Sequence, residues 1–198
     1  MEKLRGGQSR MIITIDFDET LFPTLQKVID IYNAQHNDTL SLEQITTYNL
    51  YECLDSSVAD TLIELFCKKD VYDNLQPYKG AVKVVKSLID RGHEIYIATA
   101  TDVKNLEWKE QLLQRYFPFI PKNNLIRIHQ KKLLNTDILI EDNLNTLTES
   151  FAERICFDHM WNHNDIKDYT YGIKRAYNWS DITNIINNIE KEMKKWEK

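Results

Sequence analysis

The chain has 198 residues, of which 42% are hydrophobic and 28% charged, as in a soluble globular protein of one domain with room for a small insertion. A formal net charge of −5 leaves no basic excess for phosphates, so we expect no nucleic acid polymer as a partner. No apolar run approaches the roughly 20 residues of a membrane helix, and the first ten residues lack the apolar part of a secretory signal. We therefore expect no membrane partner and a cytoplasmic protein whose three cysteines (Cys53, Cys67 and Cys156) stay reduced.

The stretch from Met11 to Phe22 begins as a short apolar run and breaks into two carboxylates, Asp16 and Asp18. Such a run predicts a buried strand of a parallel sheet. Residues i and i+2 of a strand face the same way, so both carboxylates can converge where the strand ends. Two close negative charges favour a divalent cation beside them. The carboxyl end of a parallel strand is also where open α/β sheets bind ligands.

The segment after this strand has a different residue pattern. Residues 1–10 are expected to form a loose leader, and Leu21 to about His36 has the spacing of a helix. Residues 38–76 contain short helical pieces and little strand character. We interpret residues 24–76 as a mostly helical insertion that covers the end of the first strand.

Regular alternation of helices and strands begins at Pro77. The expected strands are His93–Thr99, Leu125–Ile128, Asp137–Glu141 and Arg154–Phe157. The expected helices are one closed by Gly92, one capped by Asp102, one from about Asn143 to Phe151, and a last one capped by Ser180 with an apolar stripe from Ile182 to Trp196. This order predicts an α/β fold, a three-layer Rossmann-like parallel sheet built from residues 11–23 and 77–198.

Further polar residues fall at the ends of the predicted strands: Thr99, Lys131, Lys132, Glu141 and Asp142. Each has an ordinary structural explanation, as a helix cap, a solvated lysine or a complement to a helix dipole. In one parallel sheet, however, acids, hydroxyl and lysine all meet at the same edge. Their combination at one edge therefore carries more weight than any one of them.

These residues carry a family resemblance. The stretch Asp16-Phe17-Asp18-Glu19-Thr20-Leu21, then Thr99, Lys131 and Glu141-Asp142, resembles in order the four motifs of the haloacid dehalogenase-like (HAD) phosphohydrolases. The insertion resembles the helical cap of that superfamily. Within it, the chain is most similar to the cytosolic type C 5'(3')-deoxyribonucleotidases and their bacterial and phage relatives. That closer similarity lies in 97–101, in 108–113, and in the ten-residue spacing from Lys131 to Glu141.

The resemblance implies a role for each catalytic residue. Asp16 is implied as the nucleophile that forms an aspartyl-phosphate, and Asp18 as the general acid and then the base. Thr99, with the following amides of Ala100 and Thr101, is implied to hold the phosphoryl oxygens. Lys131 is implied to neutralise the charge between nucleophile and phosphate, with Lys132 as the alternative.

The resemblance also implies a Mg²⁺ cofactor held by Asp16, the backbone carbonyl of Asp18, and Asp142. Glu141 is then expected to order the lysine or a water on the metal. Where family members carry an aromatic residue for base stacking, this chain has Thr24. Phe22, Tyr48 and Tyr51 are the candidates to take over that role, and Ala100 replaces a hydroxyl of the family.

We therefore expect a Mg²⁺-dependent phosphatase for nucleoside monophosphates, with deoxyribonucleotides favoured and a small phosphomonoester as its partner. The alternatives are the same chemistry on another small phosphate ester, a phosphotransferase, and a catalytically silent HAD-fold binding module. The sequence leaves open whether the protein forms a homodimer. His159, Trp161 and His163 form a cluster near the predicted site, with either a loop-structural role or a role in substrate contact.

Overall fold

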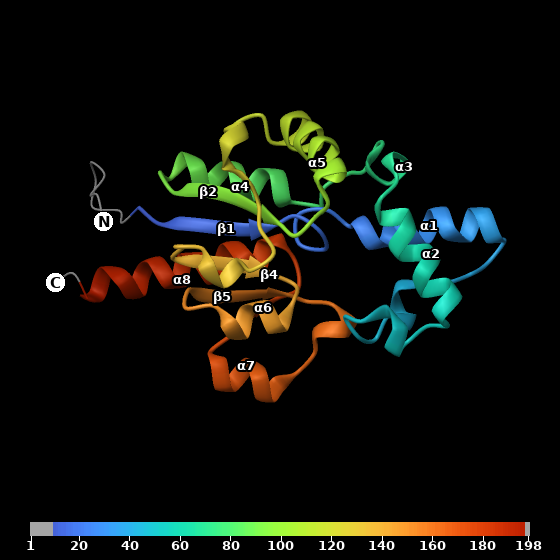
Figure 1. The fold of residues 1–198 in the computed structure, drawn as a ribbon. Coiled ribbons are helices and arrows are strands. Elements are labelled where there is room, and N and C mark those ends of the chain that lie inside the picture. Colours follow the sequence, from blue (N-terminus) through green and yellow to red (C-terminus); the bar gives the residue numbers. More distant parts are fainter. Residues whose placement is uncertain (1–9, 197–198) are drawn as a thin grey trace.

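A parallel six-stranded sheet organises residues 10–196, the part of the chain that the computed structural model describes (Figure 1). The strand order is β3-β2-β1-β4-β5-β6. The strands are β1 (Ile12–Asp16), β2 (Glu94–Thr99), β3 (Leu125–Arg127), β4 (Ile138–Glu141), β5 (Glu153–Phe157) and β6 (Lys174–Ala176). Along this order the direction of growth reverses between β1 and β4, the position at which open α/β sheets bind ligands.

Helices cover both faces of the sheet. The helices of the described residues, including those of the insertion, are α1 (Thr24–His36), α2 (Ser56–Phe66), α3 (Lys69–Tyr72), α4 (Ala81–Asp90), α5 (Val103–Tyr116), α6 (Leu144–Glu149), α7 (Asp165–Tyr171) and α8 (Trp179–Trp196). Right-handed crossovers to either side of β1 put α4 and α5 on one face and α6 and α7 on the other (Figure 1). The result is the predicted three-layer α/β fold, which is confirmed. Among the described helices, none is long and apolar enough to cross a membrane.

Two expectations for the C-terminal part were incomplete or wrong. The sixth strand, β6, and the helix α7 before it were not foreseen. Ser180 does not cap α8, because the helix begins at Trp179 and the side chain of Asn178 accepts the N–H groups of Ser180 and Asp181 at 2.8 and 3.1 Å. Asparagine is as good a cap as serine, so the pattern alone did not separate them. Residues 1–9 of the expected leader lie outside the described residues. So does the side chain of Trp196, the last residue of the expected apolar stripe.

The inserted segment is helical and lies beyond the carboxyl ends of the strands (Figure 1). Besides α1, α2 and α3 it holds two short 3₁₀ helices, Leu42–Gln44 and Leu50–Glu52. Helix α1 packs against α2 and α3, and α3 packs against α5 of the sheet layer. Val28 and Leu62 belong to the same buried cluster as Ile13 of β1. The insertion therefore shares a continuous apolar core with the sheet.

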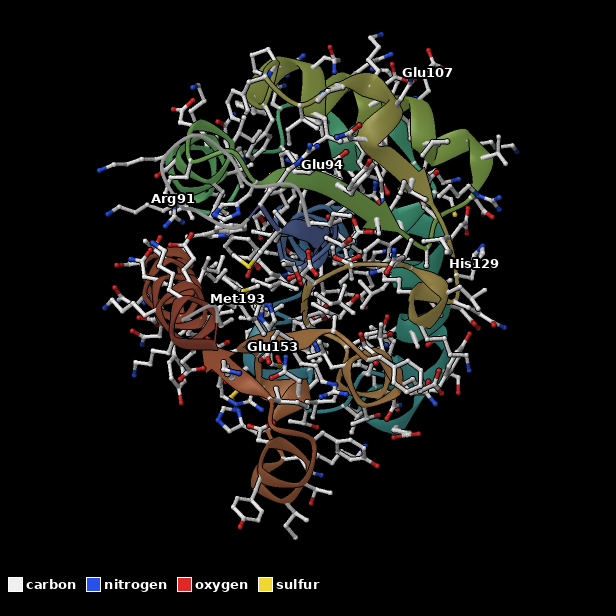
Figure 2. The ribbon with its side chains drawn as sticks, turned by 90° about the vertical axis from the view of Figure 1, so that its left-hand side faces the viewer. Arg91, Glu94, Glu107, His129, Glu153 and Met193 are labelled. Atoms are coloured by element: carbon white, nitrogen blue, oxygen red, sulfur yellow. The ribbon has the colours of Figure 1, made fainter. Side chains whose placement is uncertain are left out.

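The opposite end of the sheet is tied by ion pairs. Figure 2 looks along the strands from their amino-terminal ends, where Glu94 and Glu153 begin β2 and β5. Arg91, after α4, pairs with Glu190 of α8 at 3.1 Å, and the ring of His93 lies 2.7 Å from the same carboxylate. These contacts fasten α8 to the sheet layer, far from the carboxyl ends where the functional residues gather.

Candidate active site

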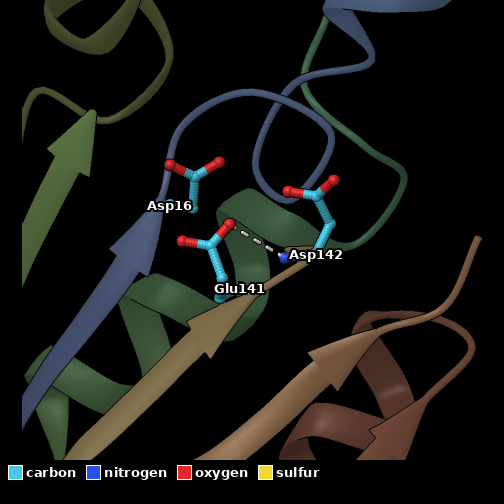
Figure 3. A group of neighbouring side chains, drawn as sticks. All are labelled: Asp16, Glu141 and Asp142. Carbon is cyan, nitrogen blue, oxygen red and sulfur yellow. Dashed lines mark hydrogen bonds between the residues drawn. The ribbon is translucent and has the colours of Figure 1, made fainter. Parts of the chain in front are cut away.

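Three buried carboxylates meet where β1 and β4 end (Figure 3). Asp16 is the last residue of β1, Glu141 the last of β4, and Asp142 follows it. One oxygen of each lies within 4.8 Å of the others, and the side chains point toward one another. The parallel pairing of β1 with β4 brings the two strand ends level, because Ile15 lies opposite Ile140. This is the arrangement that the strand-end pattern predicts.

The electrostatics of this cluster favour a bound cation. Burial, and next the charge of Glu141, raises the pKa of Asp16 to about 7. Burial, and next the charge of Asp16, raises the pKa of Asp142 to about 7. Burial raises the pKa of Glu141 to about 7 as well, although Lys131 opposes the shift. A hard divalent cation takes carboxylate oxygens and removes this repulsion, so the donor set fits Mg²⁺.

Lys131 supplies the cationic side chain of the cluster. Its ammonium contacts Asp16 Oδ1 and lies 2.5 Å from Glu141 Oε2. Burial lowers the pKa of this lysine, but the charges of Asp16 and Glu141 outweigh burial and leave the pKa raised. Lys131 therefore stays protonated at neutral pH. Lys132, the alternative, instead pairs with Glu149 at 3.1 Å on the surface.

Asp18 lies on the loop after β1, with both carboxylate oxygens engaged. Thr24 Oγ1 donates to its Oδ1 at 2.7 Å, and the ammonium of Lys109 contacts its Oδ2. The same ammonium donates to Thr99 Oγ1 at 2.9 Å and lies 4.8 Å from the ring centroid of Phe17. Lys109 is 1% exposed, so this interior contact, and not solvent, satisfies its charge. Lys109 and Thr24 had not been assigned these contacts from the sequence.

The end of β2 forms the next side of the site. Thr99 is fully buried at the last position of the strand, and its hydroxyl faces Lys109. Ala100 and Thr101 follow it and line the cavity beside the acids. The carbonyl of Thr101 accepts from Arg127 Nε at 2.7 Å, which holds this loop to β3.

The acids form the floor of a cavity of about 760 Å³ between the sheet and the insertion. Residues of the insertion provide a largely apolar wall opposite them: Tyr48, Leu50, Ile63, Phe66, Cys67 and Tyr72. Volumes of a few hundred to a thousand Å³ are typical of small-ligand sites. A floor whose acids can hold a cation beside Lys131, facing an apolar wall, fits a ligand with an anionic group at one end and an apolar ring at the other.

The three candidate aromatic residues have different positions. Phe22 is fully buried and stacks on Phe17 with ring centroids 4.6 Å apart, so it belongs to the core and does not line the cavity. Tyr51 is 50% exposed and donates to Asp60 Oδ1 at 2.6 Å, away from the cavity lining. Tyr48 does line the cavity, and it is 62% exposed. Only Tyr48 of the three can touch a ligand there without rearrangement.

Glu19 is a buried acid of the site that had no assigned role. It has a positive φ of 54°, lines the cavity, and accepts from Leu25 N at 2.5 Å and from the hydroxyl of Tyr78 at 3.1 Å. Burial is the main cause that raises its pKa to about 8. Its position directly after Asp18 in the first motif was the available signal.

The loop after β5 contacts two of the acidic residues of the site, Asp142 and Glu19. Trp161 Nε1 donates to Asp142 Oδ2 at 3.0 Å, and its ring stacks on His159 at 4.2 Å between centroids. The ring nitrogen Nε2 of His159 lies 2.6 Å from the carbonyl oxygen of Glu19. Trp161 also lines the cavity, whereas His163 lies 3.5 Å from Asp158 and does not. The cluster therefore combines a structural role with a place at the cavity edge.

Comparison with known proteins gives a consistent family. The family described as 5' nucleotidase, deoxy (pyrimidine), cytosolic type C matches residues 10–193. A 5'(3')-deoxyribonucleotidase of Bacillus subtilis is 26% identical over 175 residues, which cover 87% of this chain and 96% of that protein. The fold resembles a haloacid dehalogenase-like protein of Agrobacterium tumefaciens, with a TM-score of 0.63, 12% identity and coverage of 91% of this chain and 99% of that one. It also resembles a HAD family hydrolase of Deinococcus radiodurans with bound phosphate and sodium, with a TM-score of 0.58, 13% identity and coverage of 84% and 90%.

The match to the family runs over nearly all of the described residues, and the solved structures share the fold. The buried acids, the lysine and the cavity all lie within the matched range. The chain is a phosphoric monoester hydrolase that has the haloacid dehalogenase-like fold and belongs to the family of cytosolic type C 5' nucleotidases, deoxy (pyrimidine).

Proposed function

We propose that the protein is a Mg²⁺-dependent phosphatase that hydrolyses nucleoside monophosphates, with deoxyribonucleotides favoured, through an aspartyl-phosphate on Asp16. The observation that carries the proposal is the contact of buried Asp16 with Lys131 on the floor of a cavity that also holds Asp18. The name of the Bacillus subtilis relative supports the substrate class.

In the first step, a carboxylate oxygen of Asp16 attacks phosphorus, and the bond from phosphorus to the ester oxygen breaks. Asp18, in its protonated form, gives its proton to the departing oxygen. In the second step, Asp18 takes a proton from water, whose oxygen attacks phosphorus and releases Asp16. The protons balance, because Asp18 regains in the second step the one that it gave in the first.

Positive charge at the site lowers the activation free energy of both steps. Lys131 contacts Asp16, and the amides after Thr99 would hold the phosphoryl group near both residues. Asp16, Asp142 and the backbone carbonyl of Asp18 would hold Mg²⁺. The ion supplies charge that offsets the negative nucleophile and phosphate.

The insertion, residues 24–76, acts as the cap that selects the substrate. Its apolar wall faces the acids across the cavity and offers Tyr48, Phe66 and Tyr72 to a nucleobase. Aromatic faces bind planar rings by stacking. This assignment replaces Phe22 and Tyr51, which do not line the cavity.

The test measures phosphate release from a panel of ribo- and deoxyribonucleoside monophosphates with Mg²⁺, with and without EDTA. Asp16→Asn abolishes turnover, whereas the matched variant Asp90→Asn, at an exposed carboxylate of α4, retains it. Substantial activity in Asp16→Asn would refute the nucleophile. Release only from other small phosphate esters would keep the chemistry and discard the nucleotide substrate.

A further inference from the structure

The carboxylate of Asp18 is held at both oxygens by residues from two different elements. Thr24, the first residue of α1, donates to Oδ1 at 2.7 Å. Lys109, on α5, contacts Oδ2. The two anchors approach from the insertion and from the sheet layer, so together they define the plane of the carboxylate.

A carboxylate held at one oxygen keeps much of its rotational freedom, because the torsion to an sp² carboxyl group has a broad minimum. General acid catalysis needs the donor oxygen within about 2.6–3.2 Å of the oxygen that it protonates. The second anchor removes the remaining rotation. Preorganisation of this kind reduces the reorganisation that the transition state would otherwise require.

Thr24 is well placed for this purpose. Its side chain is fully buried, and Asp18 is the hydrogen-bond partner of its hydroxyl. A buried hydroxyl without a partner costs about 1–3 kcal/mol. The position is also the one at which the family resemblance would place a stacking aromatic residue. The side chain at position 24 therefore contacts the general acid Asp18, and contact with the nucleobase is left to other side chains.

We propose that Thr24 is a positioning residue that, with Lys109, orients Asp18 toward the oxygen of the leaving group. The inference rests on the proposed function, in which Asp18 protonates that oxygen. It goes further by predicting a loss of rate that depends on the leaving group. An alkoxide such as the 5'-oxygen of a nucleoside needs a proton to depart, whereas 4-nitrophenolate departs readily without one.

The experiment compares kcat/KM for a deoxyribonucleoside monophosphate, glycerol phosphate and 4-nitrophenyl phosphate in Thr24→Val, Thr24→Ser and the wild type. The ratio kcat/KM reports steps up to the attack on phosphorus, so release of the aspartyl-phosphate does not enter it. Loss of a hydrogen bond to a charged group corresponds to a rate loss of roughly 10- to 100-fold.

Thr24→Val is expected to lose that factor on the two alkyl esters and less than about 3-fold on 4-nitrophenyl phosphate, because only the alkyl leaving groups need the proton. Thr24→Ser restores most of the activity, because it keeps the hydroxyl. The matched control is Thr14→Val, which removes a buried hydroxyl of β1 that donates to Thr136 at 3.0 Å and lies outside the cavity. Asp18→Asn provides the reference for a missing acid.

Equal losses of Thr24→Val on alkyl and nitrophenyl esters would overturn the proposal, as would failure of Thr24→Ser to restore activity. If Thr24→Val lowers the melting temperature, Thr24→Ala removes the same hydroxyl without adding bulk, and the same comparison decides. Wild-type activity on glycerol phosphate but not on nucleotides would refute only the proposed substrate. The comparison of glycerol phosphate with 4-nitrophenyl phosphate would still test the role of Thr24. No hydrolysis of any ester by the wild type would overturn both.

Discussion

Glu19 makes the stability of the protein depend on pH. Its folded-state pKa of about 8 exceeds its ordinary value of 4.5, with burial as the main cause. Because this pKa is raised, the stabilisation from neutral Glu19 is complete below pH 4.5 and is lost as the pH rises to about 8. At about 1.4 kcal/mol per pH unit, the difference between these pKa values corresponds to about 5 kcal/mol. That is a large part of the roughly 5–15 kcal/mol that holds a domain folded.

The substitution Glu19→Gln isolates this effect. Glutamine keeps an acceptor for Leu25 N and turns its amide toward the hydroxyl oxygen of Tyr78, so both contacts survive. We expect the free energy of unfolding of the variant, relative to the wild type, to rise by about 1 kcal/mol per pH unit between pH 5.5 and 7.5. Urea unfolding in EDTA at several pH values measures it.

The control is Glu107→Gln, at an exposed carboxylate of α5, for which we expect curves parallel to the wild type. Parallel curves for Glu19→Gln as well would refute the reasoning, because they would mean that Glu19 binds the same number of protons in the folded and unfolded states.

Three further predictions concern the site and its surroundings. Trp161→Phe removes the N–H bond to Asp142, so we expect the Mg²⁺ concentration for half-maximal activity to rise about 10-fold or more; an unchanged value would mean that the indole does not orient this ligand. Lys131→Ala should lower kcat by about 100-fold or more, while Lys132→Ala, at a surface pair, retains activity; similar activities of the two variants would contradict the assignment. Phe22→Ala should lower the free energy of unfolding by about 3–5 kcal/mol with KM unchanged, because the ring is core and not cavity lining; a KM effect without destabilisation would return Phe22 to the substrate site.

The strand that ends at Asp16 could be identified from its residues alone. A short β-branched apolar run bounded by polar residues predicts a buried strand. Asp18 lies beyond the end of this strand, so the loop and not the strand period decides its position. The same local rules located β2, β4 and β5, because each combines apolar residues with a turn or helix cap. Local rules were not enough for β6, whose Lys174 and Arg175 are charged. Lys174 pairs with Glu153 and Arg175 with Asp158, acids 21 and 17 positions earlier in the chain, and local periodicity does not reveal such pairs.

What the sequence determined by itself is thus the order of elements up to β5 and the meeting of strand-end acids at one edge, since both follow from periodicity and parallel pairing. The tertiary structure alone decided which side chains face the cavity. Lys109 lies 91 positions from Asp18. In the sequence it has no feature that separates it from other helix lysines. It contacts Asp18 because α5 packs beside the loop after β1. Phe22 and Tyr48 are both aromatic residues near the site, yet one packs into the core and the other reaches the cavity. Side-chain direction of this kind depends on the packing of distant segments, which residue type does not encode.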